Sequence, residues 1–122
     1  MGNLYKRVVY VGIQVEREEI LKNLGLARKN GIDDGFYDFT EKHKLWLNAH
    51  EGLLRKIGQI NTDDSLICIG KVIDASGECE IPERHLDIME KFEEAKYEVS
   101  EYLRKLGISI GDIGIHATTH CY

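Results

Sequence analysis

One stretch near the start of the chain limits the possible folds more than any other. Residues 5–16, YKRVVYVGIQVE, are almost continuously apolar from Val8 to Val15 and are followed directly by charged residues. A strand with apolar side chains on both faces leaves no face for water, so it must be covered on both sides. We therefore expect a central strand here, with other strands on either side of it.

The first two predicted helices lie between residues 16 and 59. Residues 16–31 have acids in the first turn, where the helix dipole favours negative charge, and Gly25 is a point at which this helix can break. Its apolar positions at helical spacing are Ile20, Leu21, Leu24 and Ala27. Residues 32–59 begin with a turn and predict a helix capped by Asp38 or Thr40. Its predicted buried face consists of Trp46, Leu47, Leu53, Leu54 and Ile57.

The longest predicted helix follows Pro82, which suits a first helical turn because it lacks an N–H group. Its apolar positions alternate spacings of four and three residues: Ile88, Phe92, Ala95, Val99, Tyr102 and Leu106. Such a stripe either packs on the sheet of its own chain or pairs with the same helix of a second copy. Packing on the chain's own sheet is the commoner arrangement.

Three further segments have β character. Residues 65–73, SLICIGKVI, predict a second strand; residues 74–77 predict a turn; and residues 78–81, ECEI, predict a short third strand that completes a hairpin. Residues 108–122 predict the last strand. The order β-α-α-β-β-α-β predicts an α+β fold with a four-stranded antiparallel sheet of split β-α-β (ferredoxin-like) type, helices on one face and an extra helix in the first crossover. We expect residues 1–122 to form a single domain.

Charge and composition narrow the range of partners. A net charge of −5 and a pI near 5.5 repel a nucleic acid backbone, so we expect no nucleic acid polymer as partner. No run approaches the roughly 18 to 20 apolar residues that span a bilayer, and no signal-peptide pattern is present, so we expect no membrane partner and a cytoplasmic location. The cysteines, Cys68, Cys79 and Cys121, have no paired spacing, so we expect reduced thiols.

The last predicted strand carries the residues most capable of chemistry. Alternation places His116, Thr118 and His120 on one face and Cys121 on the other, which argues against a joint His–Cys metal site. The two histidines lie about 13 Å apart along one strand, too far for a shared zinc ion, so we expect no cofactor and no metal held by one chain. If this strand lies at a sheet edge, two copies can pair about a two-fold axis near Thr118 and set His116 of one copy against His120 of the other. Such a pair would bind a metal such as zinc, titrate near neutral pH, or only stack.

Two further patterns suggest ligand contacts. The pattern Arg-Lys-x-Gly occurs at residues 28–31, 55–58 and 104–107, and it is typical of a helix end, where the basic pair opposes the helix dipole. The alternative is that these pairs collect at one end of the molecule and bind an anion. Aromatic residues around the second helix offer surfaces on which a planar ligand can stack. The predicted ligand contacts are Arg55, Lys56, Arg104, Lys105, Tyr37, Trp46 and His50.

The chain contains none of the common phosphate-loop, dinucleotide, zinc-protease or hydrolase motifs. The leading hypothesis is therefore a small, soluble, non-enzymatic homo-oligomer that senses or sequesters an anionic or nucleotide-like small molecule. One alternative is a hydrolase or metal-dependent enzyme in which His116, Thr118 and His120 act as acid, base or ligands. The other is an acidic protein that inhibits a partner protein through its surface.

Overall fold

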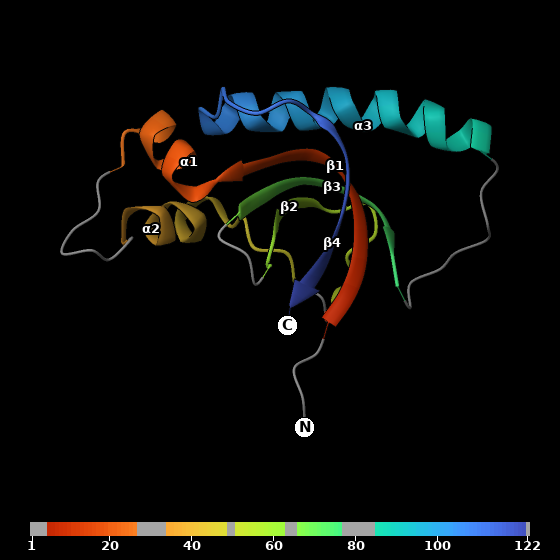
Figure 1. Ribbon diagram of the computed structural model, residues 1–122, viewed down its shortest axis with the longest axis horizontal. Coiled ribbons are helices and arrows are strands. Elements are labelled where there is room, and N and C mark those ends of the chain that lie inside the picture. Colours follow the sequence, from red (N-terminus) through yellow and green to blue (C-terminus); the bar gives the residue numbers. More distant parts are fainter. Residues whose placement is uncertain (1–4, 27–33, 49–50, 63–65, 77–84, 122) are drawn as a thin grey trace.

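The computed structural model describes residues 5–26, 34–48, 51–62, 66–76 and 85–121 (Figure 1). Its four strands are β1 (Tyr5–Glu16), β2 (Ile57–Ile60), β3 (Leu66–Ala75) and β4 (Gly114–Cys121). Its three helices are α1 (Arg17–Leu24), α2 (Asp34–His43) and α3 (His85–Leu106). The strands form one sheet in the order β2-β3-β1-β4, and every pair is antiparallel. The prediction of an α+β fold with a four-stranded antiparallel sheet is confirmed.

Strand β1 lies inside the sheet, with β3 on one side and β4 on the other. Its side chains point alternately to two separate hydrophobic cores: Val8 and Tyr10 belong to one, and Ile13 and Val15 to the other. Both faces of the strand are therefore used, which confirms the central position predicted from its continuous apolar run.

Four paired glycines cross the whole sheet. Gly58 pairs with Gly70, Gly70 with Gly12, and Gly12 with Gly114. A Cβ atom at Gly12 would collide with the carbonyl oxygen of Ile69, so the neighbouring strand approaches too closely here for any side chain. Strands β1 and β3 are strongly curved (Figure 1), and glycine allows the close approach that such curvature brings.

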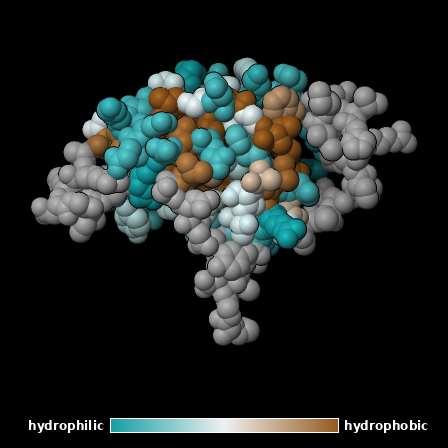
Figure 2. All heavy atoms as spheres, viewed as in Figure 1, coloured by the Kyte–Doolittle hydropathy of each residue, from teal (hydrophilic) through white to brown (hydrophobic). Residues whose placement is uncertain are grey.

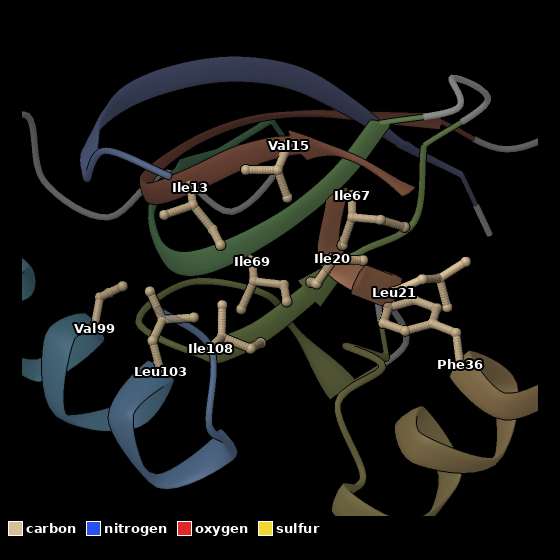
Figure 3. Packing of buried hydrophobic residues seen from close by; sticks show 10 residues of the cluster. All are labelled: Ile13, Val15, Ile20, Leu21, Phe36, Ile67, Ile69, Val99, Leu103 and Ile108. Atoms are coloured by element: carbon tan, nitrogen blue, oxygen red, sulfur yellow. The ribbon is translucent and has the colours of Figure 1, made fainter. Parts of the chain in front are cut away.

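The two hydrophobic cores lie on opposite faces of the curved sheet. Hydrophobic atoms also remain visible at the surface below α3, where β1 and β4 pair (Figure 2). The helix-side core, shown in Figure 3, receives side chains from all three helices and consists of Ile13, Val15, Ile20, Leu21, Phe36, Ile67, Ile69, Val99, Leu103 and Ile108. The loop-side core consists of Val8, Tyr10, Leu53, Ile60, Cys68, Val72 and Ala75. Helix α3 thus packs on its own sheet, with Leu103 buried near its end and the predicted Tyr102 only partly buried.

The second predicted helix is much shorter than expected. Helix α2 ends at His43, because Lys44 takes a left-handed φ of 51° and the N–H of Leu45 bonds to the carbonyl of Thr40. Leu45 is fully buried, which fixes the chain as it leaves the helix. The predicted helical face from Trp46 to Ile57 is wrong.

The residues after α2 run beside β2 instead of continuing the helix. The N–H of Leu47 donates to the carbonyl of Gln59 at 3.2 Å, the N–H of Gln59 donates to the carbonyl of Leu45 at 2.6 Å, and Trp46 forms a parallel bridge with Gln59. Residues 57–59, predicted as the end of a helix, belong to strand β2, which forms the hairpin with β3. The segment ECEI, predicted as the hairpin partner, lies outside the described residues.

Two helices end at the glycines predicted from the sequence. Helix α1 stops at Gly25, with φ of 68°, and α3 stops at Gly107, with φ of 81°, shortly after the basic pair at 104 and 105. The pair at 55 and 56 is different: Arg55 has a left-handed φ of 68° in a turn just before β2, so its interpretation as a helix end is wrong. The pair at 28 and 29 lies outside the described residues. Among the described helices, none is long and apolar enough to cross a membrane.

Candidate functional site

Trp46, the only tryptophan in the chain, is held at the surface beside α2. Its Nε1 donates a hydrogen bond to Oγ1 of Thr40 at 3.1 Å, and Thr40 Oγ1 in turn donates to the carbonyl of Tyr37 at 2.7 Å. Thr40 is fully buried, so the indole has a fixed support, yet 39% of Trp46 and 60% of Tyr37 are exposed. Trp46 is thus fixed to a residue that lies about one helical turn from the exposed Tyr37 on α2.

Three exposed basic residues lie where the chain enters the two paired segments beside Trp46. Because residues 45–47 run parallel to 58–60, the residues that precede the two segments lie at the same end of β2. Lys44 precedes the first segment, and Arg55 and Lys56 precede the second; all three are exposed. We call Tyr37, Trp46, Lys44, Arg55 and Lys56 the aromatic–basic surface.

Acidic side chains lie near this surface as well. Asp38 and Glu41 are exposed on α2, within two turns of Lys44. The positive charge is therefore local and is placed at the C-terminal end of α2, where cations oppose the helix dipole.

The other predicted ligand contacts are not part of this surface. Arg104 and Lys105 lie in the last turn of α3, and Arg104 Nη2 donates to Oε2 of Glu101 at 2.8 Å. This hydrogen bond raises the pKa of Arg104 and lowers that of Glu101, because each charge favours the other. His50 lies outside the described residues. Of the seven predicted contacts, the aromatic–basic surface thus includes Tyr37, Trp46, Arg55 and Lys56.

The histidines of β4 share a face of the strand, as predicted, but they make separate contacts. His116 pairs across the sheet with Tyr10, and the two rings stack with centroids 5.3 Å apart. His120 is 1% exposed, and its Nδ1 accepts a hydrogen bond from the backbone N–H of Asn61 at 3.1 Å. Thr118 lies between them, opposite Val8. The prediction that these three residues act together in one catalytic cleft gains no support from these contacts.

Three polar side chains lie close together in the sheet: Tyr10, His116 and Cys68. The Tyr10 hydroxyl and His116 Nε2 are both buried, and no described residue bonds to either with good geometry. Burial raises the pKa of Tyr10 far above its usual range, and the nearby Cys68 thiol adds to this effect. Across the described residues, no group of three or more His, Cys, Asp and Glu side chains is placed to hold a metal ion.

Sequence reasoning misses three residues that shape these sites. Thr40 is predicted only as a helix cap, although its hydroxyl fixes Trp46. Gln59 and Asn61 act through their backbone groups, which bond to Leu45 and His120. Backbone donors carry no side-chain signal, so no motif could have revealed them.

Comparison with protein-family models, with curated proteins and with solved structures gives no match. A function must therefore be inferred from the contacts, exposure and charge of the described residues.

Proposed function

We propose that the chain is a non-enzymatic protein that binds a planar, anionic small molecule, such as a nucleoside monophosphate, at the aromatic–basic surface. One observation carries this proposal: the parallel pairing of residues 45–47 with β2. This pairing places Lys44, two residues before the exposed Trp46, at the same end of β2 as Arg55 and Lys56. Exposed aromatic and basic side chains together are suited to a ligand that has both a flat ring and a negative charge.

The two parts of the surface have separate roles. The ring of the ligand stacks on the exposed indole of Trp46, whose orientation is fixed by Thr40, or on Tyr37. The anionic group lies near Lys44 and Lys56, whose ammonium groups supply positive charge and hydrogen-bond donors. Because the surface is open to solvent, we expect micromolar to millimolar affinity rather than tight binding.

Tryptophan fluorescence tests the proposal directly, since Trp46 is the sole tryptophan. The probes are AMP, GMP, adenosine and inorganic phosphate. We expect AMP and GMP to change the emission of Trp46 in a saturable manner, adenosine to bind more weakly because it lacks the phosphate, and phosphate alone to bind without a large spectral change. The same nucleotides are expected to raise the melting temperature.

Charge-reversal variants assign the response to the surface. Lys56→Glu and Lys44→Glu are expected to weaken AMP binding at least tenfold, whereas Lys105→Glu, on the exposed last turn of α3, is the matched control and is expected to leave it unchanged. An emission that stays constant with every probe contradicts the proposal. So does an equal loss of binding in the Lys105→Glu control.

We also propose that the sheet has the split β-α-β (ferredoxin-like) topology predicted from the sequence. The order β2-β3-β1-β4, with β1 between β3 and β4, supports a split β-α-β sheet in which α1 and α2 together occupy the first crossover. We further propose that residues 1–122 form a single domain and that the protein is cytoplasmic. Limited proteolysis tests the single-domain proposal, because one domain resists cleavage as a unit, whereas two domains give two stable fragments.

A further inference from the structure

The two outer edges of the sheet differ in what covers them. At one edge, the backbone of β2 bonds to residues 45–47 of the same chain. At the other edge, β4 pairs with β1 on its inner side, and no described residue pairs with its outer side. Alternate backbone N–H and C=O groups of β4 therefore point outward.

Strand β4 also lacks the features that protect exposed strand edges. Residues 114–121, GIHATTHC, contain no proline, lysine, arginine or acid, although 30% of the chain is charged. The pairing of β1 with β4 runs without a bulge from Gly12–Gly114 to Tyr5–Cys121. An edge strand of eight residues that is regular and uncharged is a ready template for another strand.

The exposed side chains on one face of β4 also carry no charged group. Ile115 is 50% exposed, and Ala117 and Thr119, on the same face of the strand, are also exposed. Ile115 is thus a large apolar side chain left at the surface, directly at the open edge.

We infer that a second copy of this chain pairs with β4, antiparallel and about a two-fold axis, to form a continuous eight-stranded sheet. The net charge of −5 makes two copies repel each other over most of their surfaces, and this repulsion is weakest along β4, which carries no lysine, arginine or acid. Antiparallel pairing of one strand with itself is also self-complementary, as a two-fold interface requires.

The exposed side chains fix the register. With the axis at His116, Ile115 of each copy lies opposite Ala117 of the other, so the exposed isoleucine packs against a small apolar side chain. An axis near Thr118, as considered from the sequence, would instead make His120 face the other copy's His116. His120 is 1% exposed and accepts a hydrogen bond from Asn61, so its ring is already engaged within its own chain.

Native mass spectrometry and light scattering at micromolar concentration test the inference. We expect the wild-type chain at twice its 14.0 kDa mass. Ile115→Lys and Ala117→Glu, each purified alone, are expected to be largely monomeric, because each places a charge at the interface. An equal mixture of the two is expected to recover the dimer, because the introduced lysine of one copy then faces the introduced glutamate of the other. Tyr97→Lys, at an exposed position on α3, is the matched control and is expected to remain dimeric.

Three results would overturn the inference: a monomeric wild-type chain, a dimer that persists in both single variants, or a mixture that fails to recover the dimer while circular dichroism shows both variants folded. None of these depends on nucleotide binding at the aromatic–basic surface. Failure of the dimer and failure of the proposed function are therefore distinguishable.

Discussion

The Nδ1 atom of His120 accepts a hydrogen bond from the backbone N–H of Asn61, 3.1 Å away. His120 lies near the end of β4, and Asn61 directly follows β2. Since β2 and β4 are the outermost strands of the sheet, this bond joins a side chain of one outer strand to the backbone just after the other, which requires the sheet to curl at this end. The curl explains how a histidine on an edge strand comes to be buried.

His120→Ala is expected to lower the free energy of unfolding by about 2 to 4 kcal/mol, because it removes a buried ring and leaves the Asn61 N–H without its acceptor. Urea unfolding measures the change. The control is Thr119→Ala, at the neighbouring exposed position, which is expected to stay within about 0.5 kcal/mol of the wild type. Equal losses in the two variants would show that the bond does not stabilise the curled sheet.

Tyr10→Phe is expected to alter stability mainly at alkaline pH. Burial, with a contribution from Cys68, raises the folded-state pKa of Tyr10 above its usual value of 10.0, whereas the unfolded chain releases the proton near that value. The stabilisation is therefore complete below pH 10 and is lost as the pH rises toward the folded-state pKa, by up to about 1.4 kcal/mol per pH unit.

The comparison of wild type and Tyr10→Phe isolates this effect. Near pH 8, we expect a difference below about 1 kcal/mol, because the hydroxyl makes no well-formed hydrogen bond to a described residue. Above pH 10, urea unfolding is expected to show a steeper loss in the wild type. Tyr102, whose pKa burial also raises, is present in both chains and cancels. Parallel curves above pH 10 would contradict the assignment.

Gly12→Ala is expected to destabilise the chain by more than about 3 kcal/mol or to prevent folding, because the new methyl group would collide with the backbone of Ile69 and Gly70. Gly114, in the same glycine row, is the matched control. A Cβ atom there would lie 3.7 Å from Nε2 of His116, an ordinary contact, so Gly114→Ala is expected to cost less than about 1 kcal/mol. Melting temperatures of the two variants measure the contrast, and similar values would show that close strand approach at Gly12 is not required.

The ion pair between Lys71 of β3 and Glu98 of α3 has an N–O distance of 2.8 Å, and its side chains are 19% and 39% exposed. Solvent screens a pair of this exposure, so a double-mutant cycle with Lys71→Gln and Glu98→Gln is expected to give a coupling energy of at most about 1 kcal/mol, decreasing with added salt. The same cycle at Arg104 and Glu101, both within α3, is the control and is expected to give no measurable coupling. A coupling that salt leaves unchanged would contradict this account.

Local sequence signals predicted those elements that local contacts determine. The apolar run from Val8 to Val15 identified the central strand, and Gly25 and Gly107 marked two helix ends because left-handed backbone favours glycine. Residues 45–48 and 51–59 were predicted wrongly because their apolar spacing also fits a helix. Their structure depends on backbone bonds between Leu45, Leu47 and Gln59, which pair segments twelve or more residues apart and leave no periodic pattern.

In the candidate site, too, residue types were predicted from the sequence, whereas positions that depend on contacts between distant segments were not. Tyr37 and Trp46 were predicted as ligand contacts from their residue types, and the structure places both at the surface. Lys56 was predicted as part of a helix end, yet it directly precedes β2, at the same end of this strand as Lys44, because two segments run parallel. Its position could not follow from sequence, since it depends on how α2 ends.

The sharing of β1 and β3 between two cores has a consequence for how the chain unfolds. Each of these strands contributes side chains to both the helix-side and the loop-side core, for example Ile13 and Tyr10 from β1, and Ile69 and Val72 from β3. Separating either core from the sheet would expose the back of strands on which the other core depends. The two cores are thus coupled through the same backbone, and loss of either one is expected to bring down the other in a single cooperative transition.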